Sequence, residues 1–335
     1  MNDTKSQIKE YLINKDNKFK SILRIEKLPG GSSNETWVIE YSEKKIQKKI
    51  ILRRHYLGIT NKQNPYPPLP LLIECDVMEL AQKYEVPVPK IIYKLKNDSP
   101  LSEGFFMEFV EGIALGNKIV ENNSLKELRP NLASQCGSIL AKIHSIPTSD
   151  TKKLTISLAP DELKKYQSIY RDFFWDIPVF NLSFKWLEKN LTHNKELCLL
   201  HGDYRNGNIL ISPAKGIMSV LDWELLHLGD PHEDLAWICV NSWRFGKIDL
   251  PVGGFGKRID FYNAYEKLSG RKLNKKSLKF WEVMGSLKWG IMCLKMYDAY
   301  RSGYDTSVDR AAIGRRVSET EIDLLRLITN EEDNE

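Results

Sequence analysis

The chain has 335 residues, of which 42% are hydrophobic and 28% are charged, values ordinary for a globular protein. This length fits one large domain or two lobes. The longest apolar runs, such as residues 105–110, are far shorter than the roughly 20 residues that span a bilayer, so no membrane partner is expected. A net charge of +5 permits anionic ligands but is too small to indicate a nucleic-acid partner.

Cysteine usage and the first residues bear on the compartment. The five cysteines are scattered and show no CxxC or Cys/His spacing, so neither a disulfide framework nor a zinc site is expected. No apolar segment follows residues 1–5, and no secretory signal is recognised there. Together these features favour a reduced, cytoplasmic environment.

The opening segment predicts a helix followed by a β-hairpin. Apolar positions at helical spacing predict an amphipathic helix over residues 5–23. Two strand-like runs then flank a turn made of Gly30, Gly31, Ser32 and Ser33. Such a tip exposes backbone N–H groups that can approach a phosphate, although an ordinary turn is the alternative.

Two arginines end the next predicted strand, residues 48–55. Arginine stays charged and can bind phosphate through two parallel N–H donors. We expect Arg53 to be the phosphate-binding cation because it follows the apolar residues directly, with a solvated strand end as the alternative for Arg54. A predicted helix from Leu71 carries Glu74 in its first turn, the expected partner of Arg53. A solvated glutamate is the alternative.

Beyond residue 112 the pattern is mainly helical. An apolar stripe ends at His144, which we interpret as a structural residue at a helix end. Further helices are predicted over residues 161–175, 178–191, 258–269, 277–302 and 305–327.

The most informative stretch is a loop between two apolar runs that carries His201, Asp203 and Asn208. A turn and a returning apolar run then predict a hairpin with Asp222 at its end. We therefore expect Asp203, Asn208 and Asp222 to converge. Two carboxylates and an amide oxygen suit Mg²⁺, with one carboxylate left to accept a proton. Each residue taken alone is also an ordinary turn residue.

This H-G-D-x-x-x-x-N pattern, followed by a strand-borne D-W-E, resembles the catalytic and metal-binding loops of the aminoglycoside phosphotransferase and choline-kinase-like superfamily. The G-D-P-x-x-D-L-A phrase over residues 229–236 is a further match. The terminal helices resemble the branch related to kinase-like domains fused to acyl-CoA dehydrogenases.

The resemblance covers nearly the whole chain and implies an α+β, protein-kinase-like, two-lobed fold. A small β-rich nucleotide-binding lobe would occupy residues 1–110. A larger, mainly helical lobe with the catalytic loop, metal site and acceptor pocket would occupy residues 111–335.

The resemblance also implies roles for single residues. Asp203 would be the catalytic residue, and Asn208 and Asp222 would hold Mg²⁺. His201 and Asp234 would support the site structurally. Nucleotide binding is expected of Gly30, Gly31, Ser32, Ser33, Arg53, Glu74, Glu108, Phe109 and Val110, the last three as the hinge that meets adenine through its backbone.

These roles imply an ATP- and Mg²⁺-dependent phosphotransferase that acts on a hydroxyl of a small molecule. Over residues 288–316 of the terminal helices, cations outnumber acids (Lys288, Lys295, Arg301, Arg310, Arg315 and Arg316 against Asp298, Asp305 and Asp309). That balance favours a neutral or anionic acceptor, such as a hydroxyacyl thioester or a sugar, over a polycationic aminoglycoside. An aminoglycoside acceptor and a catalytically idle nucleotide-binding regulator are the alternatives, the latter suggested only by the arginine at position 53.

Overall fold

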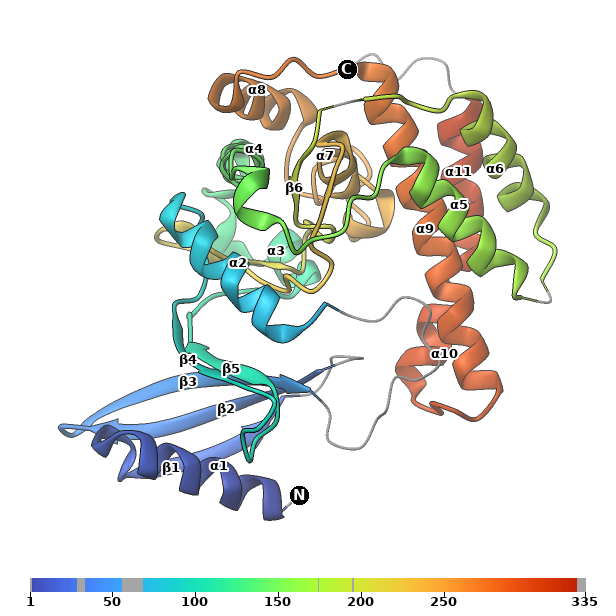
Figure 1. The fold of residues 1–335 in the computed structure, drawn as a ribbon. Coiled ribbons are helices and arrows are strands. Elements are labelled where there is room, and N and C mark those ends of the chain that lie inside the picture. Colours follow the sequence, from blue (N-terminus) through green and yellow to red (C-terminus); the bar gives the residue numbers. More distant parts are fainter. Residues whose placement is uncertain (1, 29–33, 56–68, 174, 195, 330–335) are drawn as a thin grey trace. The chain divides into compact units, whose positions relative to one another are not determined.

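The chain divides into two compact units, which we describe separately. The computed structural model describes residues 2–28, 34–55, 69–173, 175–194 and 196–329 (Figure 1). Unit 1 comprises Met1–Gly112 and Met218–Leu226, and unit 2 comprises Ile113–Ile217 and His227–Glu335. The functional assignment of lobes to residues 1–110 and 111–335 remains a prediction.

Unit 1 is built on a five-stranded antiparallel sheet with the strand order β1-β2-β3-β5-β4. Successive side chains of a strand point to opposite faces, so adjacent residues of β3 face opposite sides of the sheet. The strands are β1 (Ile22–Lys27), β2 (Asn34–Glu43), β3 (Ile46–His55), β4 (Ile91–Leu95) and β5 (Gly104–Glu108).

Helix α1 (Asn2–Lys15) packs against this sheet in a cluster with Trp37 and Phe106 (Figure 1). The predicted helix over residues 5–23 was too long. Asp16 leaves the helical conformation and accepts a hydrogen bond from Lys18 N, so a 3-10 turn, η1 (Asn17–Phe19), follows before β1 begins. Helix α2 (Leu71–Lys83) begins where the sequence predicted.

Unit 2 is mainly helical. Its helices are α3 (Gly116–Glu121), α4 (Arg129–His144), α5 (Ala159–Arg171), α6 (Pro178–Lys189), α7 (His232–Trp237), α8 (Arg258–Ser269), α9 (Lys275–Arg301), α10 (Val308–Gly314) and α11 (Val317–Thr329). Short 3-10 turns are η2 (Asn123–Leu125), η3 (Thr148–Thr151) and η4 (Asn241–Trp243). Strand β6 (Cys198–Leu200) pairs antiparallel with β9 (His227–Gly229). Strands β7 (Ile209–Ser212) and β8 (Gly216–Val220) pair in the predicted hairpin, and the chain passes into unit 1 within β8.

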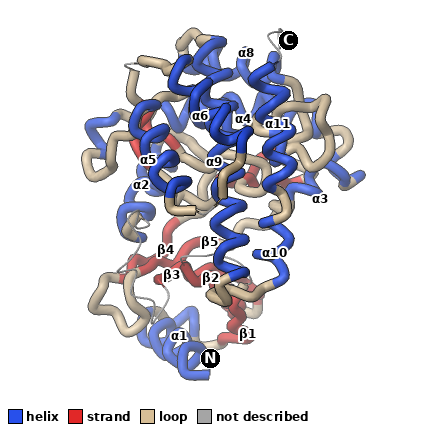
Figure 2. Tube along the Cα trace, turned by 90° about the vertical axis from the view of Figure 1, so that its right-hand side faces the viewer, coloured by secondary structure: helices blue, strands red, loops and turns tan. Residues whose placement is uncertain are grey.

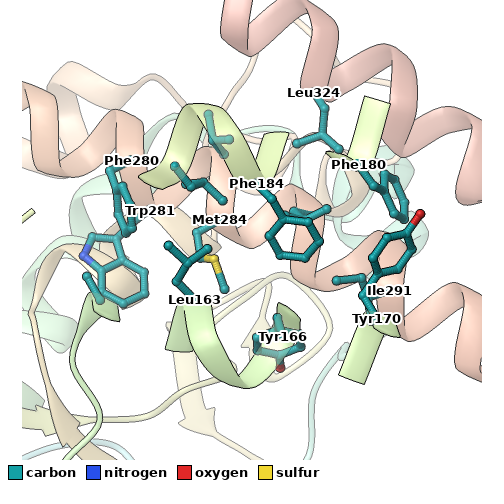
Figure 3. Close-up of a cluster of buried hydrophobic side chains, with 14 of the residues drawn as sticks. Leu163, Tyr166, Tyr170, Phe180, Phe184, Phe280, Trp281, Met284, Ile291 and Leu324 are labelled. Atoms are coloured by element: carbon teal, nitrogen blue, oxygen red, sulfur yellow. The ribbon is translucent and has the colours of Figure 1, made fainter. Parts of the chain in front are cut away.

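Four helices enclose the main core of unit 2. Aromatic residues at helical spacing, such as Tyr166 and Tyr170 on α5 and Phe180 and Phe184 on α6, meet apolar residues of α9 and α11 (Figure 3). Figure 2 shows α9 running beside α10 and α11, so this 27-residue helix is the central support of the unit.

The single helix predicted over residues 305–327 is wrong, because α10 ends at Gly314 and α11 begins at Val317. Gly314 lies directly against α9, where an added Cβ would meet the Cβ of Tyr297 at 2.7 Å. Glycine is also a poor helix former, so the chain breaks at this close contact.

All five cysteines are buried and unpaired. None of the helices in the described part of the chain combines the length and apolar character needed to cross a bilayer.

Candidate active site

The backbone of the loop after β6 is held by one buried carboxylate. Oδ2 of Asp234 accepts a hydrogen bond from His201 N at 2.7 Å, and Oδ1 accepts one from Gly202 N at 2.9 Å. Burial alone would raise the pKa of Asp234, but the hydrogen bonds from His144 and the loop outweigh it, and the pKa lies below its usual value. Asp234 therefore remains ionised and fixes the start of the loop.

His144, at the end of α4, supports Asp234. Its Nε2 lies 3.3 Å from Asp234 Oδ2, and its Nδ1 lies 2.9 Å from the hydroxyl of Tyr265. Burial lowers the pKa of His144 below its usual value, so this contact at neutral pH is a hydrogen bond from a neutral imidazole rather than an ion pair. The expected structural role of His144 fits these contacts.

Asp203 lies at the centre of the loop with three side-chain donors around it. Its Oδ1 accepts hydrogen bonds from Trp237 Nε1 at 2.7 Å and Arg205 Nε at 2.9 Å. Its Oδ2 accepts one from Asn208 Nδ2 at 2.6 Å. The backbone N of Asp203 donates to His201 Nδ1 at 3.2 Å. The Asp203 side chain keeps 14% of its exposure, so an acceptor can reach it.

The other end of the loop is fixed by Asn206, a residue that the sequence analysis did not single out. Its Nδ2 donates to the backbone oxygen of Gly253 at 2.6 Å. Gly253 has a φ of +55°, a conformation that favours glycine, and belongs to a loop distant in sequence from residues 201–208. The signal in the sequence was an amide side chain three residues after Asp203, which by itself also suits a turn.

Arg53 of unit 1 lies among three carboxylates. Its Nη2 lies 2.9 Å from both Asp222 Oδ1 and Glu224 Oε2, and its Nε lies 3.3 Å from Glu74 Oε1. The expected pairing of Arg53 with Glu74 is therefore present. It is an ion pair without hydrogen-bond geometry, because Arg53 Nε has no hydrogen-bond partner in the described part of the chain.

Burial sets the electrostatics of this cluster. It raises the pKa of Glu74 to about 7, although the charge of Arg53 acts in the opposite direction. Burial would lower the pKa of Arg53, but the surrounding carboxylates raise it well above its usual value. Arg53 therefore keeps its positive charge, and the carboxylates around it outnumber it.

Asp222 has a φ of +63°, a left-handed conformation that is strained for a residue with a Cβ. Its side chain is 35% exposed, so it can meet a ligand. Glu224 was not predicted as a site residue. It also accepts a hydrogen bond from Asn34 Nδ2 at 3.3 Å. An acid shortly after a strand also suits a solvated turn, so the sequence offered no distinct signal for Glu224.

The solvated alternative for Arg54 is wrong. Arg54 is 1% exposed, and its Nε and Nη2 lie 3.0 and 2.9 Å from Glu35 Oε2. Because adjacent strand residues face opposite sides, Arg54 points away from the Arg53 cluster and into the sheet's covered face. Its Nη1 also donates to the backbone oxygen of Leu101.

The profile of the family described as "Phosphotransferase enzyme family" matches residues 24–270. The chain belongs to this phosphotransferase family. Among curated proteins it is similar to acyl-CoA dehydrogenase family member 10 of Mus musculus, 27% identical over 223 residues that make up 63% of this chain and 20% of the relative. Member 11 of Gallus gallus is 29% identical over 266 residues, 75% of this chain and 32% of the relative. The chain thus spans a fifth to a third of these relatives.

Solved structures share the fold. A Ralstonia eutropha JMP134 protein assigned to the aminoglycoside phosphotransferases has a TM-score of 0.73 at 20% identity, over 97% of this chain and 98% of that one. A choline/ethanolamine kinase family protein from Mesorhizobium loti has a TM-score of 0.64 at 14% identity, covering 98% and 96%. The predicted α+β, protein-kinase-like fold is confirmed, as is the resemblance to kinase-like domains of acyl-CoA dehydrogenase family members.

Several predicted site residues of this family member stay predictions. Gly30, Gly31, Ser32 and Ser33 lie outside the described residues. Asp203 and Asn208 belong to unit 2 and Asp222 to unit 1, so their convergence also stays a prediction.

The expected hinge lies at the end of β5. Glu108 pairs with Ile50 of β3, and its backbone N donates to Lys90 O at 2.8 Å. Phe109 follows, with the ammonium of Lys49 5.5 Å from its ring centre. Contact of Glu108, Phe109 and Val110 with adenine stays a prediction.

The donor set suits magnesium. Asn208 and Asp222 offer amide and carboxylate oxygens, the hard ligands that Mg²⁺ prefers, and proteins commonly bind this ion through one or two carboxylates together with substrate phosphates. Among the described residues, no three His, Cys, Asp or Glu side chains are grouped as a metal site.

Proposed function

We propose that this chain transfers the γ-phosphoryl group of ATP to a hydroxyl of a small molecule. The observation that carries the proposal is the environment of Asp203, a partly exposed carboxylate held by Trp237, Arg205 and Asn208 on a loop fixed at both ends. A carboxylate held in this way can orient a hydroxyl and accept its proton. Phosphoryl transfer has a loose transition state, so positioning and charge neutralisation supply most of the catalysis.

In this reaction the acceptor oxygen forms a bond to the γ-phosphorus while the bond from that phosphorus to the β–γ bridging oxygen breaks. The electron pair of that bond leaves with ADP, and the acceptor's proton passes to Asp203. Arg53 would neutralise phosphate charge. Asn208 and Asp222 would hold Mg²⁺, which when bound neutralises charge on the phosphates.

We infer that the acceptor is neutral or anionic. Arg205 lies 2.9 Å from Asp203 Oδ1, and the ammonium of Lys288 lies 4.8 Å from the ring centre of Trp237, which donates to Asp203, and 3.7 Å from Glu233 Oε1. Two cations, each paired with a carboxylate, therefore lie near the proposed base. A polycationic aminoglycoside would meet both of them. The names of the acyl-CoA dehydrogenase relatives favour a hydroxyacyl thioester among the neutral and anionic candidates.

The test is a phosphorylation assay of the full chain with Mg²⁺-ATP and a panel of hydroxyl compounds, read as the mass gain of one phosphoryl group. The panel contains hydroxyacyl-CoA thioesters, sugars and kanamycin-type aminoglycosides. We expect phosphorylation of a neutral or anionic compound, and a loss of about 100-fold or more in turnover for Asp203→Asn. Efficient phosphorylation of an aminoglycoside would contradict the acceptor class.

The same assay separates the enzyme from an idle nucleotide-binding regulator. Asp203→Ala should abolish turnover while Mg²⁺-ADP binding, measured by calorimetry, is retained. A wild-type chain that binds Mg²⁺-ADP but phosphorylates nothing on the panel would support the regulator instead.

A further inference from the structure

We infer that Trp237 is a positioning residue which, together with Arg205, occupies Oδ1 of Asp203 and thereby assigns proton transfer to Oδ2. This inference rests on the proposed function for the role of Asp203 as base. It concerns which carboxylate oxygen of Asp203 contacts the acceptor hydroxyl, and which residue leaves that oxygen accessible by occupying the other one.

The argument follows from the number of lone pairs. An ionised carboxylate offers about four lone-pair sites, two on each oxygen. Oδ1 accepts from both the Trp237 indole at 2.7 Å and the Arg205 guanidinium at 2.9 Å, which uses both of its sites. Among the residues that the structure describes, Oδ2 accepts a hydrogen bond from Asn208 Nδ2 alone, at 2.6 Å. One site on Oδ2 is left for an acceptor hydroxyl.

Trp237 itself is held tightly. It is 6% exposed, and its ring packs edge-on against Trp243 with 5.2 Å between ring centres. Lys288 lies over its ring at 4.8 Å, a favourable cation–π contact. Gly285 of α9 lies so close that an added Cβ would stand 3.1 Å from Trp237 Cε3. The indole N–H therefore has a fixed direction, toward Asp203.

The short helix α7 thus holds both the backbone of the loop and the side chain of Asp203. Asp234 and Trp237 are three residues apart on α7 and so lie on the same helix face. Asp234 holds the loop backbone at His201 and Gly202, and Trp237 holds the reacting carboxylate. The base is aligned by the same element that anchors the loop.

The proton balance is simple. The acceptor O–H proton moves to Oδ2 of Asp203 as the oxygen–phosphorus bond forms and ADP leaves with the electron pair of the broken bond. The protonated carboxylic acid releases its proton to solvent after the product departs. Trp237 and Arg205 keep their own protons throughout, which is why they position Asp203 and take no part in the transfer.

A first measurement tests the hydrogen bond without any acceptor. The chain contains eight tryptophans, so ¹⁵N-tryptophan labelling of the full chain gives eight indole N–H signals, and Trp237→Phe assigns the one from Trp237. Asp203→Ala should move the Trp237 signal and leave that of Trp289 in place. An unmoved Trp237 signal would overturn the inference.

A second measurement tests the consequence for turnover, using the hydroxyl compound found by the panel assay. Trp237→Phe should lower kcat about 10- to 100-fold, the cost of a small misplacement, with KM for Mg²⁺-ATP changed by less than about twofold. Trp237→His, which keeps a ring N–H donor, should recover part of kcat. If Trp237 only stabilised the fold, its loss would not lower kcat while sparing KM, and a histidine would not restore part of kcat.

The matched control is Trp289→Phe. Its indole nitrogen has no hydrogen-bond partner in the part of the chain that the structure describes, so the same chemical change should leave kcat within about twofold. Full activity of Trp237→Phe would overturn the inference and leave the proposed function standing. An inactive wild type whose Trp237 signal still depends on Asp203 would overturn the proposed function and the assignment of proton transfer to Oδ2, but not the hydrogen bond.

Discussion

The adjacent residues Arg53 and Arg54 of β3 have different partners because neighbouring strand residues face opposite sides of the sheet. Arg53 lies among Glu74, Asp222 and Glu224, whereas Arg54 is buried in an ion pair with Glu35. Because side chains alternate along a strand, Arg53 lies at the proposed site, whereas Arg54 lies on the opposite face and stabilises the fold. Only Arg53 is therefore a candidate for phosphate binding.

Arg54→Met should reduce the free energy of unfolding by about 3 kcal/mol, because it leaves the carboxylate of Glu35 buried with less of its compensating charge. Urea denaturation measures this change. The control is Lys49→Met on the same strand, whose exposed ion pair with Glu40 should contribute less than about 1 kcal/mol. If Arg54→Met were as stable as wild type, the hydrogen bonds from Lys27 and Trp37 would be sufficient to stabilise the buried carboxylate of Glu35.

Sequence reasoning found the residues whose chemistry is unusual for their position. Asp203 and Asn208 stood out because polar residues in a fixed pattern interrupted apolar runs. Trp237 and Glu224 did not, because a tryptophan in an apolar helix also suits the core and an acid after a strand also suits a solvated turn. Their contacts with Asp203 and Arg53 depend on tertiary packing that no local pattern encodes.

At the scale of elements, the loop over residues 201–208 depends on the end of α4. His144 reaches Asp234 and Tyr265 from there, and both contacts suit a neutral imidazole. Its pKa is lowered by burial. Below the ordinary pKa of histidine, the unfolded chain therefore binds a proton that the folded chain does not.

Stability should consequently fall as the pH drops below about 6.5, by at most about 1.4 kcal/mol per pH unit from this residue. His144→Gln removes that dependence, so the stability difference between wild type and variant should be largest at pH 7 and narrow toward pH 5. Urea denaturation at several pH values measures it. His193→Gln, at an exposed position, is the control for loss of a histidine elsewhere. A constant difference across this range would contradict the neutral assignment of His144.

Helix α4 also makes an unusually close contact with α8. An added Cβ at Gly137 would stand 2.2 Å from the backbone oxygen of Phe261, where no side chain can give way. Gly137→Ala should therefore destabilise the chain by about 1–3 kcal/mol in thermal or urea unfolding. Ser138→Ala, one residue along the same helix, should change stability by less than about 0.5 kcal/mol. If Gly137→Ala and Ser138→Ala lowered the stability equally little, α4 would be able to move away from α8 at small cost.

For the whole molecule, the sequence predicted element types better than element ends. Long amphipathic patterns identified α5, α6, α8 and α9, since one apolar face must be buried. The end of α1 and the break between α10 and α11 were missed, because a local cap and a close approach to α9 decide them. The return of Met218–Leu226 to unit 1 had no local signal at all.

That return has a consequence for how the protein is made. Arg53 is separated from Asp222 and Glu224 by 169 and 171 residues, yet all three belong to the same unit. At 5–20 residues per second, a ribosome needs roughly 10–30 s to supply these partners after Arg53 has been synthesised. During that interval the nascent unit 1 lacks one of its segments, and Arg53 lacks two of its three carboxylate neighbours. Completion of the proposed nucleotide-binding region would then wait on synthesis of about half of unit 2.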